Sequence, residues 1–596
     1  MNSSGKLIQF LFKKMEGSTT NRQKQVSFLT AMIPLIVLFT FVISYHVDFF
    51  VWDELALVPF WEKLASGNAG LSDWLKPHND HQILFPKLVM VGMLTIFNFQ
   101  VLPLLVLTIV FAFTGYRLIW KVQIQEESHN RLGQIAITAG SFLFFSLLQW
   151  ENFLRFWQIQ LIMCIVFFIW SSYFLFVRKS STSNTVLSLI FAGISTFSFG
   201  NGIIGLVVNG FLLFFDASEK EDRKKKIIIY LAGMAIIVLL FFTTFSRGES
   251  GNSMMANLLP NLAKLPVFFL FFIGQVIVYP FYANKILAGL SLGAGFAGLL
   301  IFLFNAVKLF RHRKSAGGGL LFLFALSLWV LLSGAVIAFG RIGFGLETSV
   351  SSRYASFSAL FWVANLSLFL IILNSDRFGE KTVSRFFGFI SNQKNKLTIV
   401  VVLVMLAGAI NSFSASWRFL YYERTTLPAL SEYYKMSGNR ELLLSVYPDS
   451  TEFSKYPAVM ARIGITPFNN YPVFPYEKLD GIISSVVASP GTSTGKTSLT
   501  AEYDYDYTTQ FYNMFQGKIS GGENVVNTEV LVELKNGGFS EYYECSERNS
   551  KKDTAPGFFA LIPFRNLAKG EYVRRILVKE NGQWNYLPSE TRIIVK

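Results

Sequence analysis

The sequence predicts a polytopic α-helical membrane protein of about eleven transmembrane helices plus interfacial helices, followed by a C-terminal extracytoplasmic β-rich domain. Of its 596 residues, 52% are hydrophobic and only 15% are charged, whereas soluble domains carry roughly a quarter charged residues. The mean hydropathy is +0.42, and the apolar residues recur in runs of about 16–23 residues, each long enough to cross a ~30 Å hydrocarbon layer. This composition excludes a soluble enzyme, a disordered chain and a fibrous protein.

The distribution of basic residues sets the predicted topology. The net charge of +15 is assigned to cytoplasmic loops, as the positive-inside rule expects, and not to nucleic-acid binding. A basic N-terminus without a cleavage site places residues 1–26 inside, ahead of an uncleaved first helix. The predicted spans are 27–45, 100–120, 134–149, 159–177, two short helices within 185–215, 227–245, 287–309, 320–340, 354–373 and 397–414.

Three apolar stretches need separate treatment. Residues 83–99 and 265–285 are predicted to be interfacial or re-entrant, because counting them as crossings would misplace the next basic loops. The stretch 185–215 would be ~46 Å long as one helix, too long for one crossing without strong tilt. Basic residues flank it on both sides, so we expect an even number of crossings, with a tight break at Ser198–Gly202.

The domain division follows these spans. The transmembrane domain is predicted at 27–414, with a first outer loop at 46–99, and residues 415–475 form an extracytoplasmic helical linker region. Residues 476–596 contain short alternating segments rich in Val, Ile and Tyr, separated by Gly/Asn turns, which predict a small β-sandwich. The strand candidates are Ile482–Val487, Val525–Leu534, Phe558–Pro563, Tyr572–Val578 and Arg592–Val595.

The first outer loop opens with an acidic group, Asp48, Asp53 and Glu54. Apolar and like-charged neighbours raise the pKa of a carboxyl group, which suits a proton acceptor working near neutral pH. All three carboxylates are candidates for this proton transfer, and Asp48 is also a substrate-binding candidate. The alternative is a helix cap or ordinary loop charge.

The same loop continues with His78, Asn79, Asp80 and His81, and then Lys87. Imidazole and carboxylate suit zinc or manganese, so His78, Asp80 and His81 form a weak candidate for a divalent cation, with no clear fourth ligand. Hydrogen bonding of these residues to a polyhydroxyl or phosphate ligand is the main alternative, and a structural role is the other.

Three further candidates follow in two later outer segments. Trp150 can stack on the apolar face of a sugar ring, while Glu151 and Asn201 can bind its hydroxyl groups. The alternative for the tryptophan is a place in the interfacial aromatic belt.

The last outer segment carries Arg341, Arg353 and Tyr354 beside a glycine-rich stretch. Arginine is disfavoured on the outer face, and its guanidinium pairs bidentately with phosphate. We therefore expect this segment to bind a substrate phosphate. Headgroup binding or an ion pair with Glu347 is the alternative.

Together these groups suit one reaction on the extracytoplasmic face, where nucleotide sugars are absent. A sugar would arrive on a polyprenyl phosphate, the carboxylate would deprotonate the acceptor hydroxyl, and the arginines would stabilise the departing phosphate. A single displacement inverts the anomeric centre.

At these residues the chain resembles the bacterial type C (GT-C) membrane glycosyltransferases, which use lipid-phosphate sugars. The resemblance covers about residues 25–440. It lies in the acidic pair Asp53-Glu54 after the first helix, the stretch from His78 to Pro86, Gln-Trp-Glu-Asn at 149–152 and the segment 340–354. Asp80 and Gln82 depart from the pattern, where Glu and Arg are usual, so a role of that arginine passes to Lys76 or Lys87 or is absent.

The resemblance implies a polyprenyl-phosphate sugar donor, a cell-envelope glycan or lipid acceptor and a multi-pass place in the bacterial plasma membrane, among membrane lipids. It also implies Asp53 as the catalytic base, with Glu54 as the second choice and Asp48 as the third. Two other classes remain open. An O-antigen-type ligase or polymerase usually has a large late outer loop between helices. A lipid or polysaccharide transporter predicts ionisable residues near the midplane and repeated halves.

Overall fold

The computed structural model describes most of the chain. The described residues are 21–48, 50–78, 81–126, 131–244, 259–280, 284–312, 317–374, 394–421 and 456–464, and within the β-rich tail 500–508, 512–520, 530–537, 539–544, 546–548, 557–563, 570–580 and 583–595. The chain divides into two compact units. Unit 1 comprises residues 1–46, 70–97 and 101–420, and unit 2 comprises 47–69, 98–100 and 421–596.

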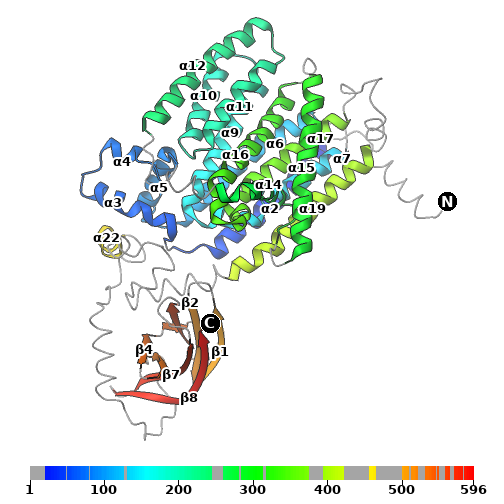
Figure 1. Cartoon of the computed structure of the whole chain (residues 1–596). Coiled ribbons are helices and arrows are strands. Elements are labelled where there is room, and N and C mark those ends of the chain that lie inside the picture. Colours follow the sequence, from blue (N-terminus) through cyan, green and yellow to red (C-terminus); the bar gives the residue numbers. More distant parts are fainter. Residues whose placement is uncertain are drawn as a thin grey trace, which may run out of the picture. The chain divides into compact units, whose positions relative to one another are not determined.

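Unit 1 is a bundle of apolar helices (Figure 1). Its α-helices are α2 (Asn21–Tyr45), α4 (Leu71–Leu75), α5 (Leu84–Ile96), α6 (Leu102–Glu126), α7 (Arg131–Phe144), α8 (Trp150–Leu154), α9 (Ile159–Ser172), α10 (Thr182–Thr196), α11 (Gly202–Leu212), α12 (Lys220–Thr244), α14 (Leu265–Gly274), α15 (Lys285–Arg311), α16 (Gly318–Arg341), α17 (Ala355–Asn374) and α19 (Lys394–Tyr421). Short helical turns join them: η2 (Leu147–Gln149), η3 (Phe156–Gln158), η4 (Tyr173–Val177), η5 (Leu213–Phe215), η6 (Leu259–Lys264), η7 (Ile342–Phe344), η8 (Leu346–Val350) and η9 (Ser352–Tyr354).

Eight helices in the described ranges are long and apolar enough to cross a membrane. Each of the eleven predicted spans falls on a helix, but α7, α10 and α11 have only 14, 15 and 11 residues. A 15-residue helix is about 22 Å long, shorter than the hydrocarbon layer. The architecture is that of a polytopic helical membrane protein, and the number of crossings stays a prediction.

The break predicted at Ser198–Gly202 is confirmed, because α10 ends at Thr196 and α11 begins at Gly202. The two helix ends approach so closely that a Cβ atom on Gly202 would lie 2.3 Å from the carbonyl carbon of Ser195. Only glycine allows this approach. The stretches 83–99 and 265–285 contain the short helices α5 and α14, as expected for segments that do not form full-length spans.

The centre of the bundle is formed by α9, α16 and α17. Their apolar windows are 83%, 78% and 94% buried, whereas those of α12 and α15 are 11% and 17% buried. Apolar packing between helices gives little advantage over lipid, so polar contacts and close packing hold such bundles together. Asn305 of α15 donates to the Asn365 carbonyl group of α17 at 2.9 Å, and Ser172 of α9 donates to Asn209 of α11 at 2.9 Å.

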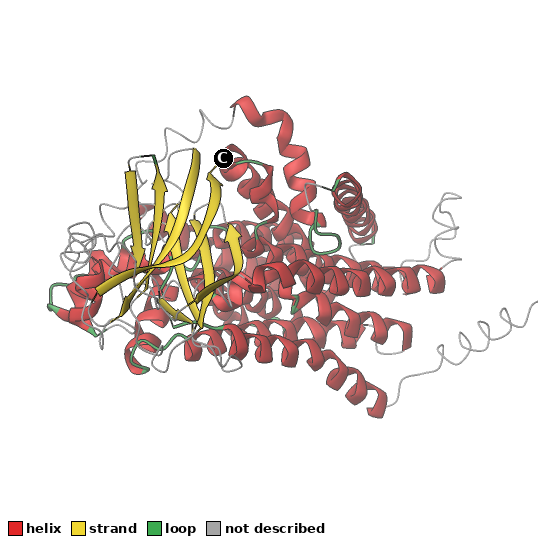
Figure 2. Ribbon diagram, turned by 90° about the horizontal axis from the view of Figure 1, so that it is seen from below, coloured by secondary structure: helices red, strands yellow, loops and turns green. Residues whose placement is uncertain are grey.

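Unit 2 contains two four-stranded antiparallel sheets, with strand orders β1-β2-β6-β5 and β4-β3-β7-β8 (Figure 2). The strands are β1 (Thr500–Thr508), β2 (Tyr512–Ser520), β3 (Val530–Asn536), β4 (Phe539–Glu544), β5 (Ser546–Arg548), β6 (Gly557–Pro563), β7 (Gly570–Glu580) and β8 (Gln583–Val595). Four of the five predicted strands overlap β3, β6, β7 and β8, and the fifth, Ile482–Val487, lies outside the described residues. Glu580 pairs with Gln583 across the predicted Asn-Gly turn.

The predicted first outer loop is divided between the units. Its first part contains η1 (Trp52–Leu57) and α3 (Val58–Ala65) and belongs to unit 2, while its second part, with α4 and α5, belongs to unit 1. Within unit 2, α3 packs on α22 (Tyr456–Ile463), and Glu62 pairs with Arg462 at 3.2 Å. Residues from the predicted linker region therefore contact the start of the loop.

Cysteine labelling tests the predicted orientation. Ser72 of α4 and Ser183 of α10 are both exposed, and they lie on segments predicted to face opposite sides of the membrane. A cysteine at position 72 should react with an impermeant thiol reagent in intact cells, and one at position 183 only after the membrane is opened. Both cysteines are introduced into a Cys545→Ser background, because the sequence places a second cysteine in the tail predicted outside. The native Cys164 is buried and should stay silent. The reverse labelling pattern would invert the topology.

Candidate functional site

Two predicted site segments of unit 1 meet at the junction of α8 with η9. Glu151 Oε1 lies 2.9 Å from Nη2 of Arg353, forming an ion pair between residues far apart in the sequence. The Ser352 hydroxyl donates to Glu151 Oε2 at 2.8 Å, and Gln158 Nε2 donates to Oε1 at 3.3 Å. The sequence offers an ion pair with Glu347 only as an alternative to phosphate binding, and in the structure the carboxylate paired with Arg353 is that of Glu151.

The neighbouring residue, Asn152, fixes the backbone of the same arginine. Its Nδ2 donates to the carbonyl oxygen of Arg353 at 3.0 Å and to Ser356 Oγ at 2.7 Å. Because a carbonyl oxygen only accepts, these contacts also fix which way the Asn152 amide faces. Ser356 in turn donates to Gln149. We call this group the polar junction, and its members are Gln149, Glu151, Asn152, Gln158, Ser352, Arg353 and Ser356.

Burial differs strongly across the ion pair. The Glu151 side chain is 6% exposed and the Arg353 side chain 33%. A carboxylate removed from water needs charged or hydrogen-bonding partners, and the three donors around Glu151 supply them. The guanidinium is the part of this pair that an incoming ligand would meet first.

Arg341, the other predicted phosphate ligand, lies in a different setting. Its guanidinium carbon is 5.6 Å from the centre of the Phe344 ring, a cation–π contact, and its carbonyl oxygen accepts from Thr348 at 3.2 Å. Gly345 follows with a φ of +103°, a conformation that L side chains rarely adopt. This turn shapes the segment after α16, and Arg341 is half-buried on it.

The loop that carries His78 and His81, here called the histidine loop, packs against η3 and against the predicted break between α10 and α11. His78 and His81 exchange backbone hydrogen bonds at 3.0 Å. The His78 ring meets Trp157 edge-on at 4.6 Å, and the His81 ring lies 3.9 Å from that of Phe199. No group of three His, Cys, Asp or Glu side chains in the described ranges could hold a metal ion. Asn79 and Asp80 lie outside those ranges, so the divalent-cation hypothesis stays open.

The buried Lys87 side chain anchors the end of α4, just before the histidine loop. Its ammonium nitrogen donates to the carbonyl oxygens of Asp73, Trp74 and Lys76, at 2.9, 3.2 and 3.1 Å, at the C-terminal end of α4. Burial, together with the positive charge of Lys76, lowers the pKa of Lys87 to about 8, so it is still protonated at neutral pH. These contacts support a structural role for Lys87, whereas the sequence suggested a substrate contact.

Replacing Lys87 by methionine should loosen the loop. Three carbonyl groups would lose their donor, at about 1–3 kcal/mol for each group left buried and unsatisfied. We expect faster hydrogen exchange of the amides at 73–78, measured by mass spectrometry. Lys76→Met, at an exposed side chain, is the matched control and should leave exchange unchanged. Unaltered exchange in Lys87→Met together with weaker donor use would restore the substrate-binding interpretation.

Three other predicted ligands are buried in the bundle. Trp150 is 8% exposed, so little of its ring is open to a sugar. The Asn201 carbonyl oxygen accepts from the Trp329 indole at 2.9 Å, which ties the α10–α11 turn to α16. Tyr354 is 6% exposed, with its ring centre 6.1 Å from that of Phe272. These positions favour packing roles in this conformation.

The two predicted catalytic residues of the acidic segment in unit 2, Asp53 and Glu54, differ in their burial and in their contacts. Glu54 is 2% exposed and accepts the backbone N–H of Val51 at 2.9 Å, so it caps η1. Asp53 is only half-buried, as is Asp48. Trp52, just before Asp53, has a φ of +52° and is 36% exposed. A non-glycine residue in this region costs of order 1–3 kcal/mol, and such strain gathers at functional sites.

An aromatic cluster supports this segment. The Phe50 ring stacks on Trp61 at 6.0 Å, and Phe99 meets the same indole edge-on at 5.4 Å. Trp61 is 4% exposed. The cluster packs together residues that precede and follow η1, so it holds in place the turn that carries the acidic pair.

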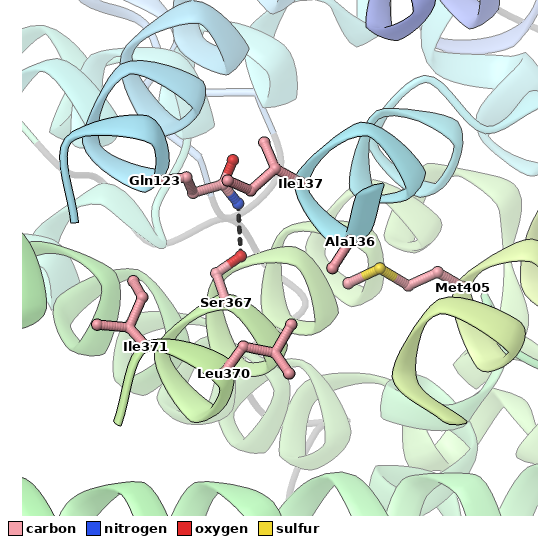
Figure 3. Close-up of a pocket in the computed structure, with 7 residues that line it drawn as sticks. All are labelled: Gln123, Ala136, Ile137, Ser367, Leu370, Ile371 and Met405. Carbon is pink, nitrogen blue, oxygen red and sulfur yellow. Dashed lines mark hydrogen bonds between the residues drawn. The ribbon is translucent and has the colours of Figure 1, made fainter. Parts of the chain in front are cut away.

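A separate cavity lies in the other half of the bundle (Figure 3). It is lined by Gln123, Ala136, Ile137, Ser367, Leu370, Ile371 and Met405. Gln123 donates to Ser367, twelve residues into α17, which is about 18 Å along the helix from the polar junction. None of these lining residues titrates, so the cavity offers no acid–base chemistry.

Sequence reasoning missed Ser352 and Gln158 as parts of the polar junction. It also missed the buried Arg155, whose backbone bonds to Glu151 and Gln158. Arg155 is 5% exposed and joins α8 to η3. The available signal was its position four residues after Glu151, in a stretch otherwise rich in aromatic side chains. A buried arginine in such a stretch is unusual.

The fold and the polar junction thus define a polytopic helical membrane protein with ionic side chains gathered at helix ends. No protein-family model matches the chain, and searches of curated proteins and of solved structures find no match to it.

Proposed function

We propose that the protein is an integral membrane glycosyltransferase that moves a sugar from a polyprenyl-phosphate donor to a cell-envelope glycan or lipid acceptor on the extracytoplasmic face. The observation that carries the proposal is the polar junction. A buried carboxylate there holds a partly exposed arginine at the end of a membrane helix. Ionisable groups beside the apolar part of a membrane helix are energetically costly and mark functional sites.

In this proposal Arg353 binds the donor phosphate and Asp53 receives the proton of the acceptor hydroxyl. The acceptor oxygen bonds to the anomeric carbon, and the bond from that carbon to the phosphate oxygen breaks. The electron pair leaves with the phosphate, where the guanidinium stabilises the new charge. The anomeric centre is inverted. Arg341 would contribute to the positive field from the neighbouring turn.

The alternatives are an O-antigen-type ligase or polymerase and a lipid or polysaccharide transporter. A transporter predicts ionisable residues near the midplane. Two ion pairs described in unit 1, Glu151–Arg353 and Asp216–Lys226, both lie near helix ends. This placement favours chemistry at a membrane surface over passage through the bundle.

Deleting the gene in the host bacterium tests the proposal without knowing the sugar. Mass spectrometry of the envelope glycans should show one sugar missing, restored by the wild-type protein and not by Asp53→Asn. Loss or shortening of a whole polymer would favour the ligase or polymerase alternative. Unchanged glycans would contradict a glycosyltransferase.

A further inference from the structure

We propose that Glu151 is a positioning residue that orients the Arg353 guanidinium for the donor phosphate, a role that rests on the proposed function. The sequence suggested that Glu151 binds sugar hydroxyls. In the structure its carboxylate receives three donors, from Ser352, Arg353 and Gln158. A carboxylate accepts about four hydrogen bonds, so little capacity remains for a sugar.

The contacts around Arg353 hold it from two sides. Glu151 holds the guanidinium through Nη2, and the adjacent Asn152 holds the arginine's own carbonyl oxygen. One short helix, α8, therefore fixes both the backbone and the side chain of a residue from η9. A group held in place in this way keeps its geometry during the reaction.

The exposure of the two side chains supports the same division of roles. The Glu151 side chain is buried and the Arg353 side chain is one-third exposed, so an anionic ligand meets the arginine and not the glutamate. The negative charge of Glu151 opposes phosphate binding while its hydrogen bonds set the direction of the guanidinium. Removing this charge should therefore strengthen phosphate binding and slow sugar transfer.

The test compares Glu151→Gln with wild type in two measurements. Binding of undecaprenyl phosphate, the probe, is measured on the full-length protein in nanodiscs, and activity is measured as the missing sugar restored in the deletion strain. Removing the opposing charge should tighten probe binding by about tenfold. Loss of orientation should lower sugar transfer by about 100-fold. A residue that only stabilised the fold would weaken both together.

Two controls make each outcome decisive. Glu347→Gln, at an exposed glutamate near the same segment, should change neither measurement, and Arg353→Ala should weaken probe binding by about 100-fold. If wild-type binding depends on Arg353 but Glu151→Gln binds no more tightly, the positioning role is overturned and the proposed function stands. If wild type does not bind the probe, or Arg353→Ala binds it equally, the donor site and the positioning role both fail.

Discussion

Asp53→Asn is expected to lower sugar transfer by about 10³-fold while leaving the fold intact, within the usual range for a general base. Asparagine keeps the size of the side chain but cannot take the proton of the acceptor hydroxyl. Asp53 is half-buried and follows the strained Trp52, so it is the accessible member of the acidic pair. Transfer is measured as sugar restored in the deletion strain, and folding as thermal unfolding in detergent.

Glu54→Gln is the matched control for this experiment. Because Glu54 is buried and caps η1, its loss of charge should cost about 1 kcal/mol of stability and leave most of the activity. Full transfer by Asp53→Asn would remove Asp53 from the mechanism. A folded but inactive Glu54→Gln protein beside an active Asp53→Asn protein would assign the base to Glu54.

Arg353→Ala is expected to raise the KM for the lipid donor by about 100-fold. The variant loses the proposed charge pair between the guanidinium and the donor phosphate, and loss of such a hydrogen-bonded pair costs about 2–5 kcal/mol. The KM for the acceptor should stay near the wild-type value. Part of the loss would come from Glu151, which would remain buried without its cation. Kinetics with donor and acceptor varied separately in isolated membranes measure both effects.

Two further variants separate these causes. In the double variant Glu151→Gln/Arg353→Ala the stranded charge is gone, so the remaining loss of donor affinity reports the phosphate contact. Arg341→Ala should have a smaller effect, about tenfold, since the contact that its guanidinium makes with Phe344 is a cation–π contact of modest strength. Equal losses toward donor and acceptor in Arg353→Ala would contradict a phosphate role.

Much of the fold could be predicted because the bilayer imposes simple rules. Long apolar runs gave the helices, and equal basic flanks located the break at Ser198–Gly202 that separates α10 from α11. Gly/Asn turns and alternating residues located most of the β-strands. The observed helix ends differ from the predicted ones by several residues. For example, α19 continues to Tyr421, beyond the predicted boundary at 414.

The contacts within the site could not be predicted in the same way. Glu347 is closer to Arg353 in sequence, yet the partner is Glu151, because helix packing and not chain distance brings the ends of α8 and η9 together. The sequence predicts that Lys87 binds substrate, whereas in the structure its ammonium group donates to three carbonyl oxygens at the end of α4. For the acidic group the sequence offers a helix cap as the alternative to catalysis, and in the structure Glu54 takes that role.

Photo-crosslinking tests the central claim most directly, namely that the polar junction binds a lipid phosphate. The probe is undecaprenyl phosphate carrying a diazirine near the phosphate, added to the full-length protein in nanodiscs. Cross-linked peptides should come from 149–158 and 341–356, disappear in Arg353→Ala and persist in Asp53→Asn. Cross-links confined to the sparsely buried helices α12 and α15, and unaffected by Arg353→Ala, would contradict the claim.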